Sequence, residues 1–149
     1  MTNGKIRNSA YWVTTILGPS SFVIGGALSL TGSDQVLSGL NHLGYPAYFA
    51  TILGVWKLLG AIAITLPRFP RLKEWAYAGF VFDLTAAAIS HASVGDSTGE
   101  IIAPLMFLAL VLASWALRPD SRRLEAPAVR ESVSSARAVD RFAASPAQA

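Results

Sequence analysis

Four long apolar runs, joined by shorter polar segments, dominate the pattern of the chain. They cover Tyr11–Leu30, Tyr45–Leu66, Trp75–Ala92 and Ile101–Leu117. Their lengths of 20, 22, 18 and 17 residues are close to the roughly 20 helical residues that cross a hydrocarbon core of about 30 Å. No run shows the alternation of apolar and polar positions that a barrel strand requires. The first run is also longer than the roughly 7–15 apolar residues of a cleaved signal segment. The pattern therefore predicts an all-α fold with four retained membrane-spanning helices.

The segments between the runs predict a short surface helix and two turns. Residues Asp34–Leu43 place apolar side chains at positions 36, 37, 40 and 43, which is the spacing of an amphipathic helix lying on a membrane surface. Pro67 and Pro70 bracket a tight turn between the second and third runs. Ser97 and Thr98 precede the fourth run, and either is a candidate helix cap. Short connections of this kind predict an antiparallel four-helix bundle.

Composition supports a membrane protein and excludes several kinds of chemistry. Only 14% of the residues are charged and 52% are hydrophobic, whereas an ordinary soluble domain has about a quarter of its residues charged. The chain has no cysteine, which excludes disulfide scaffolds, thiol nucleophiles, iron–sulfur clusters and cysteine zinc sites. After Arg118 the composition changes to Ala, Arg, Ser and Pro. We therefore expect a four-span membrane domain over residues 1–118 and a disordered basic cytoplasmic tail over residues 119–149.

The basic residues predict how the spans are oriented. Eleven of the twelve lie before the first run, between the second and third runs, or after the fourth run. The segments 31–44 and 93–100 contain no Lys or Arg. The positive-inside rule then places both termini in the cytoplasm, with the chain as a multi-pass protein of the inner, or plasma, membrane. This distribution explains the basic character of the chain through contact with the lipid bilayer, so no nucleic-acid partner is expected.

Two opposite charges lie inside the second and third runs. At 1.5 Å per helical residue, Lys57 and Asp83 lie about 13 Å and about 12 Å from the cytoplasmic ends of their spans, and they are equidistant from Pro70 along the chain. Because a charge in mid-membrane needs a partner or a role, we expect an intramembrane ion pair. Three interpretations remain open: a structural pair that fixes helix register, a pair that handles a ligand or a proton, or no contact at all, with Lys57 extended to the interface and Asp83 protonated.

A second group of polar residues is expected at the outer rim of the membrane. His42, Tyr45, His91 and Glu100 fall at about the same level, close to Asp96, and are candidate binding residues for a polar head group. The alternative is an interfacial histidine that is hydrogen-bonded to a loop. The sequence contains no glycine-rich phosphate loop, no nucleophile elbow and no His-Glu-x-x-His motif, so no metal site is predicted.

Several stretches carry a family resemblance. They are Leu43–Pro46, Leu53–Gly60, Leu72–Phe80, and the pairs Ser90-His91 and Gly95-Asp96. With these stretches, residues 10–118 resemble the DoxX-like family of small bacterial membrane proteins. The resemblance implies four membrane helices and a link to thiosulfate–quinone oxidoreduction or to defence against oxidative stress. It supplies no catalytic motif that could be transferred to this chain.

The expected function follows from these observations together. We expect a DoxX-like integral membrane protein that is accessory to quinone-linked or oxidative-stress redox chemistry and binds a small hydrophobic molecule or a partner subunit near Lys57 and Asp83. No cofactor is evident, and quinone is the candidate small molecule. The expected protein partner is a redox subunit or a second copy of the chain. Two alternatives are a cofactor-free isomerase or hydrolase, with Asp83 as acid or base beside Lys57, and a small transporter or channel component.

Overall fold

The computed structural model describes residues 2–124, and these residues are helical with short connections. The helices are α1 (Thr2–Leu17), α2 (Ser21–Leu30), α3 (Asp34–His42), α4 (Tyr48–Thr65), α5 (Pro70–Ser93) and α6 (Thr98–Leu117), followed by the 3-10 turn η1 (Asp120–Arg122). The predicted all-α class is confirmed, and the predicted short helix is present as α3, while its place on a membrane surface stays a prediction. Most of the predicted tail, residues 125–149, lies outside the described residues.

Within residues 2–124, three segments are long and apolar enough to cross a membrane. They are Lys5–Leu30, Tyr48–Thr65 and Thr98–Leu117, which indicates a multi-pass membrane protein. The remaining predicted span corresponds to α5, whose 24 residues exceed the roughly 20 needed for a crossing. Polar residues along α5, among them Asp83 and His91, lower its mean hydropathy, so α5 is not among the three and its membrane crossing stays a prediction.

The first apolar run is not one straight helix. The sequence pattern predicts an uninterrupted helix, but the chain leaves the helix at residues 18–20 and divides the run into α1 and α2. Pro19 has no amide hydrogen to donate, so the helical hydrogen-bond ladder is interrupted there. Gly18 permits a close approach to α6, because a Cβ atom at this position would lie 3.0 Å from the Cβ atom of Leu110. The break allows α1 to pack on α6 while α2 packs on α4.

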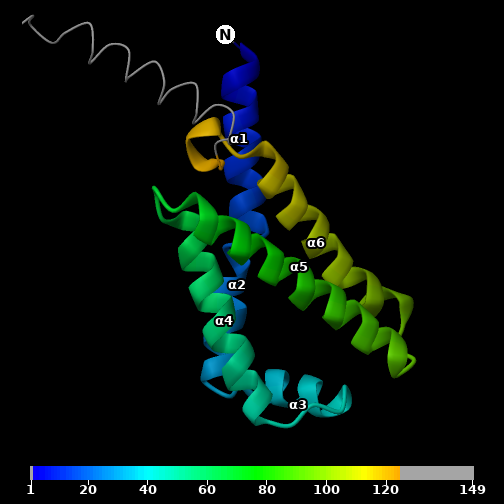
Figure 1. Cartoon of the computed structure of the whole chain (residues 1–149). Helices are drawn as coiled ribbons and strands as arrows, with labels where there is room; N and C mark the ends of the chain where they lie inside the picture. Colours follow the sequence, from blue (N-terminus) through cyan, green and yellow to red (C-terminus); the bar gives the residue numbers. More distant parts are fainter. Residues whose placement is uncertain (1, 125–149) are drawn as a thin grey trace, which may run out of the picture.

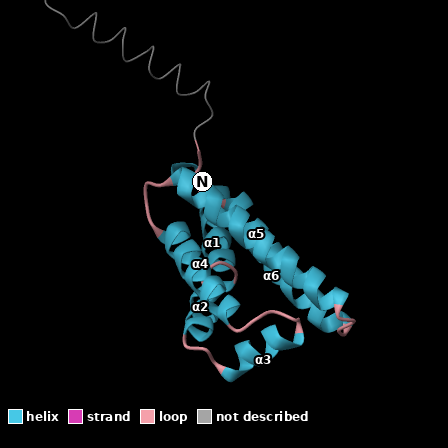
Figure 2. Ribbon diagram, turned by 60° about the horizontal axis from the view of Figure 1, so that its bottom comes forward, coloured by secondary structure: helices cyan, strands magenta, loops and turns pink. Residues whose placement is uncertain are grey.

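The helices form two arms that meet at one end of the molecule. One arm contains α2 and α4, and the other contains α5 and α6 (Figure 1). The arms separate toward the opposite end, where α3 lies across the ends of α2 and α4 (Figure 2). We call this opposite end the α3 end. The end where the arms meet is called the basic end, because it carries Arg68, Arg71, Lys73, Arg118 and Arg122.

Small residues bring α2 and α4 into direct backbone contact. A Cβ atom at Gly54 would lie 2.9 Å from the Gly26 carbonyl oxygen and 2.8 Å from Cγ of Leu30. Glycine is therefore the residue that fits this crossing, as at many helix contacts in membranes. Between the arms, the rings of Phe22 and Phe80 stack with centroids 4.2 Å apart. Gly60 leaves room for the Phe80 ring, which would lie 2.9 Å from a Cβ atom at that position.

Hydrogen bonds and an ion pair of charged side chains connect the helices at the basic end. Lys73 is buried and donates hydrogen bonds from Nζ to the carbonyl oxygens of Ala63, Ile64 and Leu66, which end α4. A cation at this position also interacts favourably with the helix dipole. Arg118, just after α6, forms an ion pair with Glu74 of α5 at 2.8 Å. These contacts hold the three helices together where their connecting segments meet.

The packed part of the chain continues into η1. The guanidinium of Arg122 lies 4.9 Å from the centre of the Trp12 ring. It also donates to the hydroxyl of Tyr11 and to the carbonyl oxygen of Ile64, each at 3.4 Å. Contacts with α1 and α4 therefore extend several residues past position 118, where the sequence composition changes.

Candidate functional site

A cavity of about 710 Å³ lies between α4 and α5, where the two arms separate. Leu40 and Leu43 bound it at the α3 end, and Leu72 and Ala63 lie near its other end. Aromatic side chains supply much of its wall: Phe22, Phe49, Trp56, Trp75, Phe80 and Phe82. The cavity is therefore an apolar space that runs along much of the length of α4 and α5.

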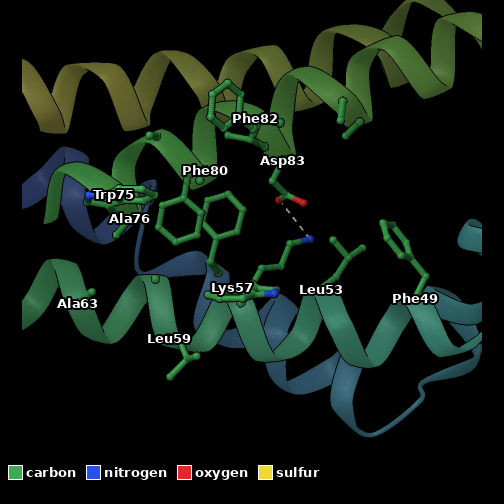
Figure 3. A pocket seen from close by; sticks show the side chains of 18 of the residues that line it. Phe49, Leu53, Lys57, Leu59, Ala63, Trp75, Ala76, Phe80, Phe82 and Asp83 are labelled. Atoms are coloured by element: carbon green, nitrogen blue, oxygen red, sulfur yellow. Dashed lines mark ion pairs between the residues drawn. The ribbon is translucent and has the colours of Figure 1, made fainter. Parts of the chain in front are cut away.

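The predicted ion pair is present inside this cavity. Lys57 Nζ and Asp83 Oδ2 are 3.5 Å apart, and the two side chains are 22% and 20% exposed. Figure 3 shows Lys57 extending from α4 toward Asp83 on α5, with the two charged groups meeting between the helices. Both residues line the cavity. The interpretation in which the two charges make no contact is therefore wrong, and the pair is placed where a bound molecule could reach it.

The surroundings of Lys57 are apolar and aromatic. Its Nζ lies 5.8 Å from the centre of the Phe22 ring, within the range at which a cation is attracted to an aromatic face. The rings of Phe22 and Phe80 stack on each other and line the same cavity as the ion pair. Figure 3 shows Phe80 beside Lys57 and Asp83. An ammonium group has three N–H donors, and its contact with one carboxylate oxygen leaves donors for a ligand.

The candidate binding residues at the α3 end do not form one cluster: His42 and His91 contact Asp96, Tyr45 contacts Ser90, and Glu100 makes a separate contact described below. Asp96 brings two histidines together: Oδ1 lies 2.6 Å from Nε2 of His42, and Oδ2 lies 2.6 Å from Nδ1 of His91. The hydroxyls of Tyr45 and Ser90 are 2.8 Å apart at the wall of the cavity. The structure thus brings His42 and His91 to one carboxylate and places Tyr45 directly at the cavity.

Glu100 has a local role that the sequence analysis did not anticipate. Its carboxylate accepts hydrogen bonds from the backbone amide and the hydroxyl of Ser97, in a capping box that begins α6. Ser97 is therefore the helix cap, as predicted. Because the Glu100 carboxylate is engaged at its own helix terminus, it does not join the Asp96 contacts.

The hydrogen bonds of this cluster shift the ionisation of two groups. The hydrogen bond to Asp96, together with its negative charge, raises the pKa of His42 above 6.5. The hydrogen bonds from His42 and His91 lower the pKa of Asp96 below its usual range. Within residues 2–124, no group of three or more His, Asp or Glu side chains is arranged to hold a metal ion. The cluster is a hydrogen-bonded link between α3 and the turn before α6.

Several residues of the site had no distinguishing signal in the sequence. Phe22 and Phe80 are apolar residues within apolar runs, so their position beside the ion pair depends on how the arms cross. The same holds for Leu40 of α3 and for Leu43, which directly follows α3, since both appear in the sequence only as part of the apolar face of a short helix. Asp96 stood out as the acidic residue of a glycine-rich turn, but its two histidine partners required the folded chain.

The arrangement can hold an amphipathic molecule. The pair of Lys57 and Asp83 is close to neutral as a unit, and it provides both a donor and an acceptor in an otherwise apolar space. Pockets for small ligands usually have volumes of roughly 300–1,000 Å³, with mostly apolar walls and a few polar groups that orient the ligand. The cavity has these properties.

Comparison with known proteins identifies one family. A sequence model of the DoxX-like family matches residues 13–114, which is more than half of the chain. No curated protein and no solved structure matches the chain.

Proposed function

The chain belongs to the DoxX-like family, and we propose that it is a four-span inner-membrane protein that binds a small hydrophobic molecule between α4 and α5. In this proposal it acts as an accessory to quinone-linked or oxidative-stress redox chemistry. The observation that carries the proposal is the 710 Å³ apolar cavity that contains the ion pair of Lys57 and Asp83.

The ion pair supports α5 as the fourth membrane span. An isolated carboxylate in the hydrocarbon core costs several kcal/mol, but a nearby cation lowers this cost. Lys57 supplies that cation from the neighbouring helix α4. With α5 spanning the membrane, the basic end faces the cytoplasm, because Lys and Arg accumulate on that side. The α3 end then faces the opposite side.

A quinone fits the cavity by its chemistry. A quinone ring is flat and apolar, and its carbonyl oxygens accept hydrogen bonds. Lys57 would donate to one of these oxygens, and the rings of Phe22 and Phe80 would contact the face of the bound molecule. A quinone supplies electron-acceptor chemistry when bound. The chain itself contributes an oriented donor, an apolar wall and the exclusion of water.

The same pair supports a second candidate, a cofactor-free isomerase or hydrolase. The carboxylate of Asp83 faces the cavity and would exchange a proton with a bound substrate, while the ammonium of Lys57 stabilises negative charge. A binding protein holds its ligand unchanged, whereas an enzyme releases an altered molecule. Mass spectrometry of the molecule recovered after incubation therefore separates the two.

The binding proposal is tested by titrating the protein in mild detergent with a short-chain ubiquinone. Trp56 and Trp75 line the cavity, so binding there should quench the intrinsic fluorescence of tryptophan in a saturable manner. Native mass spectrometry of the untreated protein should in addition detect a co-purified hydrophobic molecule.

Two alanine-to-phenylalanine variants provide a matched comparison. Ala87 lines the cavity, whereas Ala109 is exposed on α6 outside it. The Ala87→Phe variant should fill the cavity and raise the ubiquinone concentration needed for half-maximal quenching at least tenfold. The Ala109→Phe variant should leave this concentration unchanged. Equal quenching in the two variants and in the unmodified protein would show that the quinone only dissolves in the detergent, and the proposal would be wrong.

A further inference from the structure

Helix α3 lies at one end of the cavity, and a glycine with a positive φ angle lies on each side of it in the sequence. Leu40 and Leu43 contribute to the cavity wall there. Gly32 and Gly44, on either side of α3, have φ values of +63° and +83°. Glycine adopts this left-handed conformation without a steric penalty. The short helix is thus bounded by two positions at which the chain turns sharply.

The contacts of α3 differ on its two sides. It packs on α2 and α4, whereas its connection to the other arm is polar. His42, the last residue of α3, reaches Asp96 at 2.6 Å. Just beyond α3, Tyr45 reaches Ser90 of α5 at 2.8 Å. The link across the gap between the arms therefore depends on hydrogen bonds, and the one between His42 and Asp96 joins two groups that titrate.

We propose that the His42–Asp96 contact is a proton-dependent latch that holds α3 across the end of the cavity. The inference rests on the proposed binding function, since it describes how access to that same cavity is controlled. When the imidazole of His42 is protonated, it donates a charge-assisted hydrogen bond to the carboxylate, which is stronger than the bond from a neutral ring. Acidification closes the latch and a rise in pH loosens it.

The charges around the latch come from each neighbouring element. His42 lies on α3, His91 on α5, Asp96 in the turn that follows, and Glu100 in the first turn of α6. The two carboxylates both favour a protonated His42. His91 contacts the other oxygen of Asp96 but lies on the same side of the gap, so it does not bridge the two arms.

Exposure distinguishes the two members of the latch. The side chain of His42 is 57% exposed, while that of Asp96 is 9% exposed. The imidazole can therefore exchange protons with water, and the carboxylate is held in place by His91. A solvent-exposed titrating group on α3 thus meets a largely buried acceptor on the opposite arm, which is the arrangement that a reversible contact requires.

The test measures the distance between α3 and α5 with two spin labels. The chain has no cysteine, so Ser38→Cys on α3 and Ser93→Cys at the end of α5 provide the only labelling sites. Both positions are exposed. Double electron–electron resonance on the full chain in lipid vesicles should give a short, narrow distance distribution at about pH 5.5. At about pH 8.5 the distribution should become broader and shift to longer distances, since His42 loses its charge across this range.

Two histidine variants on this labelled background identify the responsible group. His42→Gln should remove the pH response, whereas His91→Gln should keep it, because of the two histidines only His42 bridges the arms. An unchanged distribution at the two pH values, or a response that survives in His42→Gln, would overturn the latch. The ubiquinone titration is carried out at a single pH and is independent of this measurement. Loss of binding with a preserved distance change would therefore contradict the proposed function and leave the latch standing.

Discussion

Lys57 of α4 and Asp83 of α5 face each other at 3.5 Å across an otherwise apolar cavity. Each residue is the charged member of a long apolar stretch on its own helix, and each makes the other less costly to place in a membrane. The pair joins the two arms at the point where they begin to separate. The arms therefore depend on this contact in a way that can be measured.

Removing one charge should destabilise the protein more than removing both. Lys57→Met leaves the carboxylate of Asp83 without its partner, and we expect a loss of about 2–3 kcal/mol. This is below the roughly 3–5 kcal/mol for fully buried pairs, because both side chains are partly exposed. The double variant Lys57→Met, Asp83→Leu should recover a large part of this loss. Thermal unfolding in detergent, measured for both single variants and the double variant, gives the interaction energy. A loss in the double variant equal to the sum of the losses in the two single variants would show that the pair does not interact.

The contact between α2 and α4 should not tolerate a methyl group at Gly54. Gly54→Ala places a Cβ atom 2.8 Å from Leu30 and 2.9 Å from the Gly26 carbonyl oxygen, so the helices must move apart. We expect a loss of about 1–3 kcal/mol, as for other overpacked contacts. The control is Gly25→Ala, where no atom lies within 4 Å of the added group and the better helix propensity of alanine should leave stability unchanged or slightly increased. Equal unfolding temperatures for the two variants would contradict the proposed contact.

Replacing the buried Lys73 at the basic end should lower the stability of the protein more than replacing the exposed Arg71. Lys73→Met leaves the terminal carbonyl groups of α4 without their donor, and we expect a loss of about 2–3 kcal/mol. Arg71→Met removes the same charge from an exposed position and should change stability by less than about 0.5 kcal/mol. Thermal unfolding of the two variants, side by side, tests the difference. If the losses are similar, the effect comes from the net charge of this end and not from the hydrogen bonds.

Stability at the α3 end should depend on pH in a defined direction. The pKa of His42 is raised in the folded state, so its contribution is complete below its unfolded value near 6.5 and is lost as the pH rises through the higher folded value. The pKa of Asp96 is lowered, so its contribution is present above its unfolded value near 3.9 and is lost as the pH falls through the lower folded value. The end should therefore be most stable in the mildly acidic range.

The His42→Gln variant isolates this contribution. The difference in unfolding temperature between the native protein and the variant should decrease as the pH is raised from about 6 to about 9. Hydrogen exchange of the α3 amides, corrected for the intrinsic effect of pH, should report the same change locally. A constant difference over this range would mean that the charge of His42 does not contribute.

Much of the helical layout could be predicted from the sequence, because a chain that crosses a lipid bilayer must form apolar helices of a defined length. Apolar runs of membrane-spanning length predicted the helices, and the spacing of apolar residues in 34–43 predicted α3. The meeting of Lys57 and Asp83 was predictable from their equal distances to Pro70, since an antiparallel hairpin aligns such positions. In each case one linear measurement along the chain was sufficient.

Most of the remaining features depend on how the helices pack against one another, which the sequence of a single helix does not indicate. The crossing of α2 and α4 uses Gly26 and not its neighbour Gly25, and the rotation of the helix decides between them. The cavity exists because the arms separate, and the divergence of two helix pairs leaves no periodic mark in the sequence. The capping role of Glu100 was missed although it is local, since a serine followed three residues later by a glutamate is the sequence signature of a capping box.

Because of the break at Gly18 and Pro19, the two halves of the first apolar segment pack on two different helices, which the ribosome synthesises at different times. The half formed by α2 meets α4 soon after that helix is synthesised, whereas the half formed by α1 packs on α6, the last helix of the bundle. During biosynthesis α1 therefore cannot make its contact with α6 until α6 has been synthesised. A chain shortened before α6 would leave α1 without the helix on which it packs.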